Sequence, residues 1–157
     1  MNSNNQNLKL WKRLNGTAIG RWLHARIVCW VAPYFRTIKP VFTKLEPGHV
    51  EVKVKNRRGV QNHLKSVHAI AMCNAAELVG GVCIDVSLDP KFRWIPVGMT
   101  VQYLKMAKTD LTAKCKLEQF DWSEPGDVVM PVGVFDANDI EVFHADITMR
   151  VSEKKRR

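Results

Sequence analysis

His68 and Glu77 interrupt the apolar, Ala-rich run that follows Ser66 in the segment NHLKSVHAIAMCNAAELVGG, residues 62–81. Imidazole and carboxylate groups serve as general acids, general bases and nucleophiles. In a helix, nine residues make two and a half turns, so the two side chains leave opposite faces and stand roughly 13 Å apart along the axis. They cannot meet within one chain. A shared site would need the carboxylate from a second copy of the helix.

The element that positions this pair is a predicted helix from Ser66 to Leu78. Ser66 is a suitable N-cap, and Gly80 and Gly81 are typical of a helix stop. Four alanines make the helix slim enough for other elements to approach closely: Ala69, Ala71, Ala75 and Ala76. The pattern predicts a buried helix that other elements wrap.

Most of the remaining chain has the alternation of strands. Val50, Val52 and Val54 alternate with charged residues, and further strands are predicted at 99–107, 111–117, 127–135 and 140–151. Turns are predicted at 123–127 (SEPGD) and 136–139 (DAND). In the last strand, odd-numbered residues 143–151 are apolar and even-numbered ones polar. The sequence therefore predicts an α+β domain in which a long antiparallel sheet curls around one helix.

The N-terminal segment predicts an amphipathic helical extension over residues 1–32, before a main domain at 33–151 and a basic tail at 152–157. Apolar residues recur at near-helical spacing from Leu8 to Trp22, with Lys and Arg between them. Gly16 and Gly20 favour two short helices over one, and the Asn-rich start is expected to fray. Such a helix packs on its own domain, on a partner subunit or on a membrane surface.

The net charge of +9 is concentrated near the N-terminus, where residues 1–60 hold twelve Lys or Arg and two acidic residues. This predicts either attraction to an anionic partner or a solvated basic face. The chain shows no nucleic-acid-binding motif, so no nucleic acid is expected. The four cysteines lack metal-binding spacing and are expected to be reduced core thiols, with no metal. No secretory signal is evident, and we expect a cytoplasmic location.

Three stretches resemble the hotdog-fold acyl-CoA thioesterase superfamily: APYFRTIKP at 32–40, NHLKSVHAIAMCNAAEL at 62–78 and RWIPVGMTVQY at 93–103. The similarity covers roughly residues 33–150. It is strongest to a bacterial subfamily related to the phenylacetate-pathway thioesterases. Those enzymes show an Asn, a His six residues later and an acidic residue nine beyond it, which here are Asn62, His68 and Glu77.

The chain also departs from that pattern. The two residues after the His are commonly Gly-Gly but are here Ala69 and Ile70. A position that is often Gly is Lys65, and the acid is Glu instead of Asp. These differences leave the expected fold unchanged and leave the substrate open.

The resemblance implies roles for individual residues. Backbone amides around His68 and Ala69 would bind the carbonyl oxygen at the helix N-terminus, and Glu77 of the partner subunit would be general base or nucleophile. Asn62 would orient water or the carbonyl, and the His68 side chain would help hold the thioester by hydrogen bonding. Trp94 would either line the acyl pocket or fill the core. His63 would either contact the substrate or pack in its loop. Asn74 would either make a polar contact between the two central helices of the dimer or take part in the reaction. The CoA phosphates would meet a basic rim: Arg57, Arg58, Lys65 and Arg93.

The expected function is hydrolysis of an acyl-CoA or acyl-carrier thioester at the interface of a homodimer, which could pair further into a dimer of dimers. No cofactor is expected beyond the coenzyme A of the substrate. The alternative is a hotdog module that binds acyl-CoA or lipid without catalysis, which the missing Gly-Gly pair and Lys65 favour.

Overall fold

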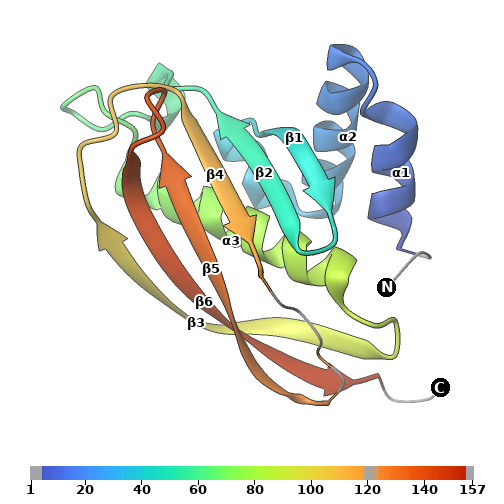
Figure 1. Cartoon of the computed structure of the whole chain (residues 1–157). Helices are drawn as coiled ribbons and strands as arrows, with labels where there is room; N and C mark the ends of the chain where they lie inside the picture. Colours follow the sequence, from blue (N-terminus) through green and yellow to red (C-terminus); the bar gives the residue numbers. More distant parts are fainter. Residues whose placement is uncertain (1–4, 119–121, 123, 155–157) are drawn as a thin grey trace.

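A six-stranded antiparallel sheet curves around one central helix, α3 (Ala69–Ser87), in the computed structural model of this chain (Figure 1). The structure describes residues 5–118, 122 and 124–154. In spatial order the strands are β1 (Val41–Glu46), β2 (His49–Val54), β4 (Leu111–Lys116), β5 (Gly126–Phe135), β6 (Glu141–Glu153) and β3 (Phe92–Tyr103). This arrangement confirms the predicted α+β fold.

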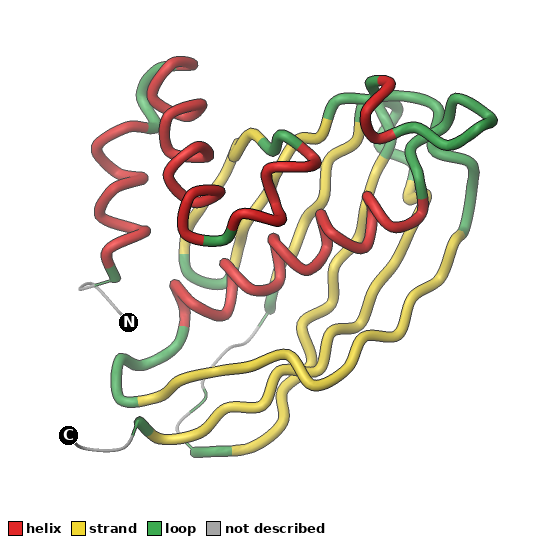
Figure 2. Tube along the Cα trace, turned by 180° about the vertical axis from the view of Figure 1, so that it is seen from behind, coloured by secondary structure: helices red, strands yellow, loops and turns green. Residues whose placement is uncertain are grey.

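Helix α3 is apolar on almost every side because the sheet wraps it and the 3₁₀ helix η1 (Pro33–Ile38) contacts part of its other face (Figure 2). By length and composition alone, α3 could also span a membrane, but most of it is buried within this fold. It is therefore the core helix that the sequence predicts.

The predicted ends of this helix are wrong. His68, and not Ser66, is the N-cap, and the helix continues past Gly80 and Gly81 to Ser87. A Cβ atom at Gly80 would lie 3.0 Å from Cδ1 of Ile147, and one at Gly81 would lie 3.0 Å from the Trp94 ring. The two glycines therefore allow close packing of sheet and helix and do not end the helix.

The N-terminal segment forms two helices, α1 (Gln6–Leu14) and α2 (Ala18–Val31), as Gly16 and Gly20 indicate. Asn5 and Thr17 cap them through their side-chain oxygens. Both helices pack beside β1 (Figure 1). The rings of Trp11, His24 and Phe42 contact one another there. The N-terminal segment thereby covers the β1 edge of the sheet.

Four of the predicted strands correspond to β2, β4, β5 and β6, and the five residues assigned to the inner face of β6 are buried, as is Val142. The strand predicted at 99–107 is misplaced, since β3 begins at Phe92 and ends at Tyr103. β1 was not predicted. Residues 1–4, Ser123 of the predicted SEPGD turn and residues 155–157 of the basic tail lie outside the described residues. All four cysteines are free thiols.

Candidate active site

The N-terminus of α3 offers one backbone donor. The imidazole Nδ1 of His68 accepts a hydrogen bond from the Ile70 amide at 3.1 Å, which caps the helix. The His68 amide donates to the Val60 carbonyl at 2.7 Å, so it is not free for a ligand, contrary to our expectation. The Ala69 amide has no acceptor among the described residues. A ligand oxygen at this end would therefore meet the Ala69 N–H and the positive end of the helix dipole.

Asn62 shapes the loop that leads to the helix. Its Oδ1 accepts hydrogen bonds from the Leu64 amide at 2.9 Å and the Ser66 hydroxyl at 3.1 Å. The side-chain oxygen is thus engaged within its own loop instead of facing water or a carbonyl, as the resemblance implied. Lys65 in this loop has φ 60°, a left-handed conformation that favours glycine and explains why glycine suits this position. His63 is exposed in the same loop.

A small hollow of about 200 Å³ lies beside His68, between α3, η1 and the loop before α3. Its wall includes Asn74, whose Nδ2 donates to the Thr37 hydroxyl at 2.9 Å. Asn74 is 6% exposed, and its Oδ1 has no partner among the described residues. Thr37 and Tyr34, which also line the hollow, were not identified from the sequence, although both lie in the APYFRTIKP stretch.

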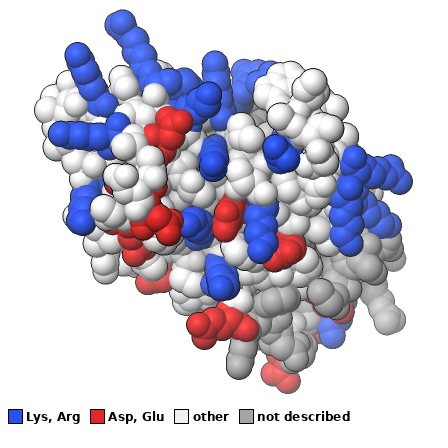
Figure 3. All heavy atoms as spheres, turned by 45° about the horizontal axis from the view of Figure 1, so that its top comes forward, with Lys and Arg blue, Asp and Glu red and all other residues white. Residues whose placement is uncertain are grey.

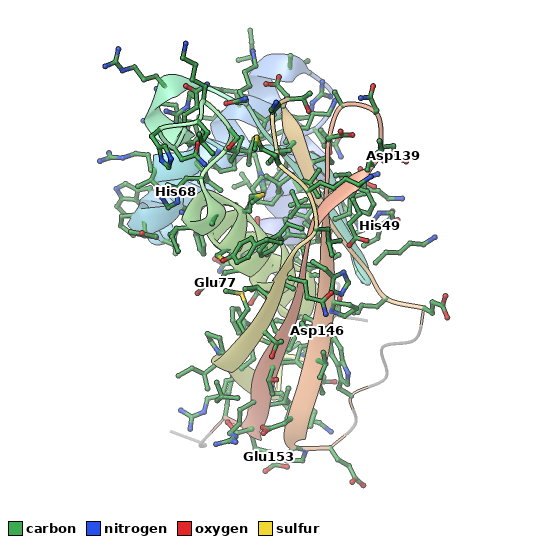
Figure 4. The ribbon with its side chains drawn as sticks, turned by 90° about the vertical axis from the view of Figure 1, so that its left-hand side faces the viewer. His49, His68, Glu77, Asp139, Asp146 and Glu153 are labelled. Atoms are coloured by element: carbon green, nitrogen blue, oxygen red, sulfur yellow. The ribbon has the colours of Figure 1, made fainter. Side chains whose placement is uncertain are left out.

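Glu77 lies on a different hollow. It is exposed, and it lines a cavity of about 580 Å³ between α3, the N-terminal helices and β3. Figure 4 shows His68 at the N-terminal end of α3 and Glu77 farther along the helix. Trp94 lines the same cavity and packs against Gly81, so it serves both as core and as cavity wall. Within one chain the imidazole and the carboxylate are therefore separated, as their spacing predicts.

The four predicted phosphate-binding residues do not gather in one chain. Arg57, Arg58 and Lys65 lie near the N-terminus of α3, where Arg57 donates to the Thr37 carbonyl at 2.6 Å. Arg93 lies near the other end of the helix, at the start of β3, and donates to the Ser152 hydroxyl at 3.0 Å. A 19-residue helix is about 28 Å long, which separates the two groups. Lys and Arg are spread over the upper half, the centre and the right-hand side of the face in Figure 3, with acidic side chains among and below them.

A sheet wrapped in this way around a single long helix defines a hotdog domain, and the solved structures most like it include hotdog-fold thioesterases. A probable thioesterase from Pseudomonas aeruginosa is 21% identical, with 78% of this chain and 88% of that one covered and a TM-score of 0.70. A thioesterase from Haemophilus influenzae is 10% identical, with 79% and 85% covered and a TM-score of 0.69. At these identities the likeness shows the fold alone.

The sequence shows to which family the chain belongs. The chain belongs to the DUF4442 family, a domain of unknown function, whose profile matches residues 20–151. A protein solved as a structural-genomics target is 40% identical, with 94% of this chain and 98% of that one covered and a TM-score of 0.84. No curated protein matches the chain.

Proposed function

We propose that this protein hydrolyses acyl-CoA thioesters, with Glu77 as general base or nucleophile. The observation that carries the proposal is an exposed carboxylate at an apolar cavity of about 580 Å³, on a helix whose first amide has no acceptor among the described residues. An acyl group needs an apolar site, and its hydrolysis needs a base and a donor for the developing oxyanion. Thioesterase activity in the hotdog proteins that share this fold supports the same chemistry.

The reaction divides between two subunits. The thioester oxygen accepts a hydrogen bond from the Ala69 N–H of one subunit, and Glu77 of the other takes a proton from water as it attacks the carbonyl carbon. The tetrahedral intermediate then expels the CoA thiolate, which takes up the proton to give the thiol and a carboxylic acid. His68 contributes by capping the helix, which holds the Ala69 amide in place.

The sheet supports a dimer because its two edges differ. α2 covers β1, whereas β3 pairs with β6 alone among the described strands and leaves its other edge open over twelve residues. Long open edges pair readily with a second chain, and β3 exposes Ile95, Val97 and Met99. Two β3 strands paired antiparallel would set the Arg93 end of one beside the Tyr103 end of the other.

That pairing would also complete the basic rim. Cys73, in the second turn of α3, lies 3.6 Å from the Tyr103 hydroxyl, so the end of β3 lies near the start of the helix. Arg93 from the second subunit would then approach Arg57, Arg58 and Lys65 of the first. A rim of this kind suits the phosphates of CoA, and a further association of two dimers stays a prediction. The relation to the phenylacetate-pathway enzymes and the cytoplasmic location are part of the same proposal.

A contact between α2 and an anionic membrane surface is a further part of the proposal. Ile19 and Trp30 are 78% and 83% exposed, and with Trp22 and Leu23 they lie at helical spacing along one exposed stripe of α2. Ile27 and Val31 continue the same spacing but line the cavity beside Glu77. The first acidic residue of the chain is Glu46, after eight Lys or Arg. Exposed Trp on a basic helix is typical of helices that lie on anionic lipid.

The experiment that tests hydrolysis is release of free CoA thiol from a panel of straight-chain and aromatic acyl-CoAs. The wild-type chain should turn over at least one class, and Glu77→Gln should lower the rate by at least about 10²-fold. Glu153→Gln, an exposed glutamate at the far end of β6, serves as control and should be fully active. Acyl-CoA binding without turnover by the wild-type protein would instead establish the non-catalytic module.

A further inference from the structure

The cavity beside Glu77 runs lengthwise along α3. The helix contributes Glu77, Leu78, Gly81, Val82 and Asp85 to its wall, which are spaced as neighbours on one face. The eight steps of helix from Glu77 to Asp85 span about 12 Å. The cavity is thus a channel with the proposed catalytic carboxylate at one end.

The sides of this channel come from parts of the chain outside the central helix. Ile27 and Val31 of α2 and Phe35 of η1 form one side, and Trp94 and Pro96 of β3 form another. These side chains are apolar, so burying a hydrocarbon against them is favourable, whereas a charged or hydroxylated group there would lose its water without a replacement partner. The polar wall residues Asn5, Gln6 and Asn7 lie at the start of α1.

A polar contact lies at the far end of the channel. Asn5 Nδ2 donates to the backbone carbonyl of Asp85 at 3.0 Å and to its carboxylate at 2.9 Å. Asn5 also caps α1 by accepting a hydrogen bond from the Leu8 amide. The N-terminal helix is thereby tied to the C-terminal part of α3, which sets the length of the channel.

We infer that this channel binds the acyl chain of the substrate and that the substrate class is a straight, saturated acyl-CoA of medium length, an inference that rests on the proposed function. With carbon–carbon bonds of about 1.5 Å, an extended chain advances about 1.25 Å per methylene, so a length of about 12 Å holds about ten carbons. A short or single-ring acyl group would leave most of this apolar wall unfilled.

The test measures binding separately from hydrolysis. S-alkyl-CoA thioethers have no ester carbonyl and cannot be hydrolysed, so their dissociation constants can be measured by calorimetry on the full chain. Affinity should rise at least about twofold per added methylene from ethyl to decyl and then level off at tetradecyl. Affinity that does not depend on chain length would overturn the inference.

Two variants locate the channel. Ile27→Trp fills the channel and should weaken binding of the decyl thioether about tenfold, while binding of the ethyl thioether changes less than twofold. Leu23→Trp, on the same helix but outside the cavity, should bind both thioethers as the wild type does. Asn5→Ser keeps an N-cap but is too short to reach Asp85, so the plateau should move to longer chains. Equal weakening of all lengths by Ile27→Trp, or an unmoved plateau in Asn5→Ser, would contradict this channel.

The two proposals fail in different ways. Length-dependent thioether binding without hydrolysis of any acyl-CoA would overturn the hydrolase and keep the channel. Hydrolysis of acyl-CoAs at rates and affinities that do not depend on chain length would support the proposed hydrolase activity and contradict the proposed channel.

Discussion

His68 and Glu77 lie nine residues apart on α3 and line two different hollows of the same chain, one beside η1 and one beside α2. Each hollow supplies half of what thioester hydrolysis needs. The hollow at His68 lies at the helix N-terminus with its free Ala69 amide, and the hollow at Glu77 has a carboxylate and an apolar channel. Two chains related by a two-fold axis can bring the halves together.

Ala69→Pro should abolish turnover without harming the fold. Ala69 is the first residue of α3, where proline is favoured and its missing N–H breaks no hydrogen bond among the described residues. His68 has φ −65° and ψ 141°, a conformation that a following proline allows. We expect the rate of CoA release to fall by about 10²-fold to 10³-fold.

The control for this variant is its stability. Urea denaturation should give a free energy of unfolding within about 1 kcal/mol of wild type. A stable Ala69→Pro protein with full activity would show that the Ala69 amide does not bind the oxyanion.

Lysine on the open sheet edge should separate the dimer. We expect Ile95→Lys combined with Met99→Lys to give a folded monomer in sedimentation velocity, because charged side chains on an edge oppose pairing with a second strand. Val129→Lys changes an equally exposed residue on β5, inside the sheet, and should leave the dimer intact. A dimer that survives the double substitution would place the interface elsewhere.

Acidification should unfold the protein partly through His24. This side chain is fully buried between Trp11 and Phe42, with its Nε2 2.7 Å from Asn7 Oδ1. Burial lowers its pKa from 6.5 to about 4, so the unfolded chain binds the proton more readily than the folded one. This contribution to stability is complete well above pH 6.5 and is lost as the pH falls toward 4.

Urea titrations check this effect. From about pH 7.5 to pH 5, the His24 contribution to the free energy of unfolding should fall by about 2 kcal/mol. His24→Gln keeps a donor for Asn7 and removes the titration, so its stability should depend less on pH by about that amount. Equal slopes in the two proteins would mean that His24 is protonated in the fold.

Binding to anionic vesicles tests the exposed stripe on α2. The wild-type protein should sediment with phosphatidylglycerol vesicles, more weakly at high salt and little with phosphatidylcholine. Trp22→Ala combined with Trp30→Ala should weaken this binding roughly tenfold, while Leu104→Ala, an exposed apolar residue outside α2, should not. A double variant that binds normally to vesicles, or changes only the oligomeric state, would assign the stripe to a second copy of the chain instead.

Much of the fold follows from the sequence because its central helix and inner strands have regular apolar patterns. The exceptions have local causes. β1 buries Phe42 and Leu45, three residues apart, because an irregularity in its pairing between Phe42 and Lys44 breaks the alternation. β3 has a similar register shift between Pro96 and Gly98, and its edge is open. Its apolar residues are therefore largely exposed and do not mark a buried face in the sequence.

The site could be predicted only in part. Side-chain type and spacing identify Glu77 and His68, and they exclude a contact between them within one chain. Sequence could not show that the His68 amide is occupied by Val60, nor that Asn62 is engaged in its own loop, because both depend on how distant backbone segments meet. The contribution of α2 to the cavity wall could not be predicted from the sequence for the same reason.

In the proposed mechanism, each active site takes Glu77 from one subunit and the Ala69 amide from the other. Mixing equal amounts of Glu77→Gln and Ala69→Pro protein, with subunit exchange, would form mixed dimers that hold one intact site each. About a quarter of wild-type CoA release should be recovered, since half the dimers are mixed and each has one of two sites intact. Activity that stays at the level of the separate variants would contradict this mechanism, because both groups would then act within one chain.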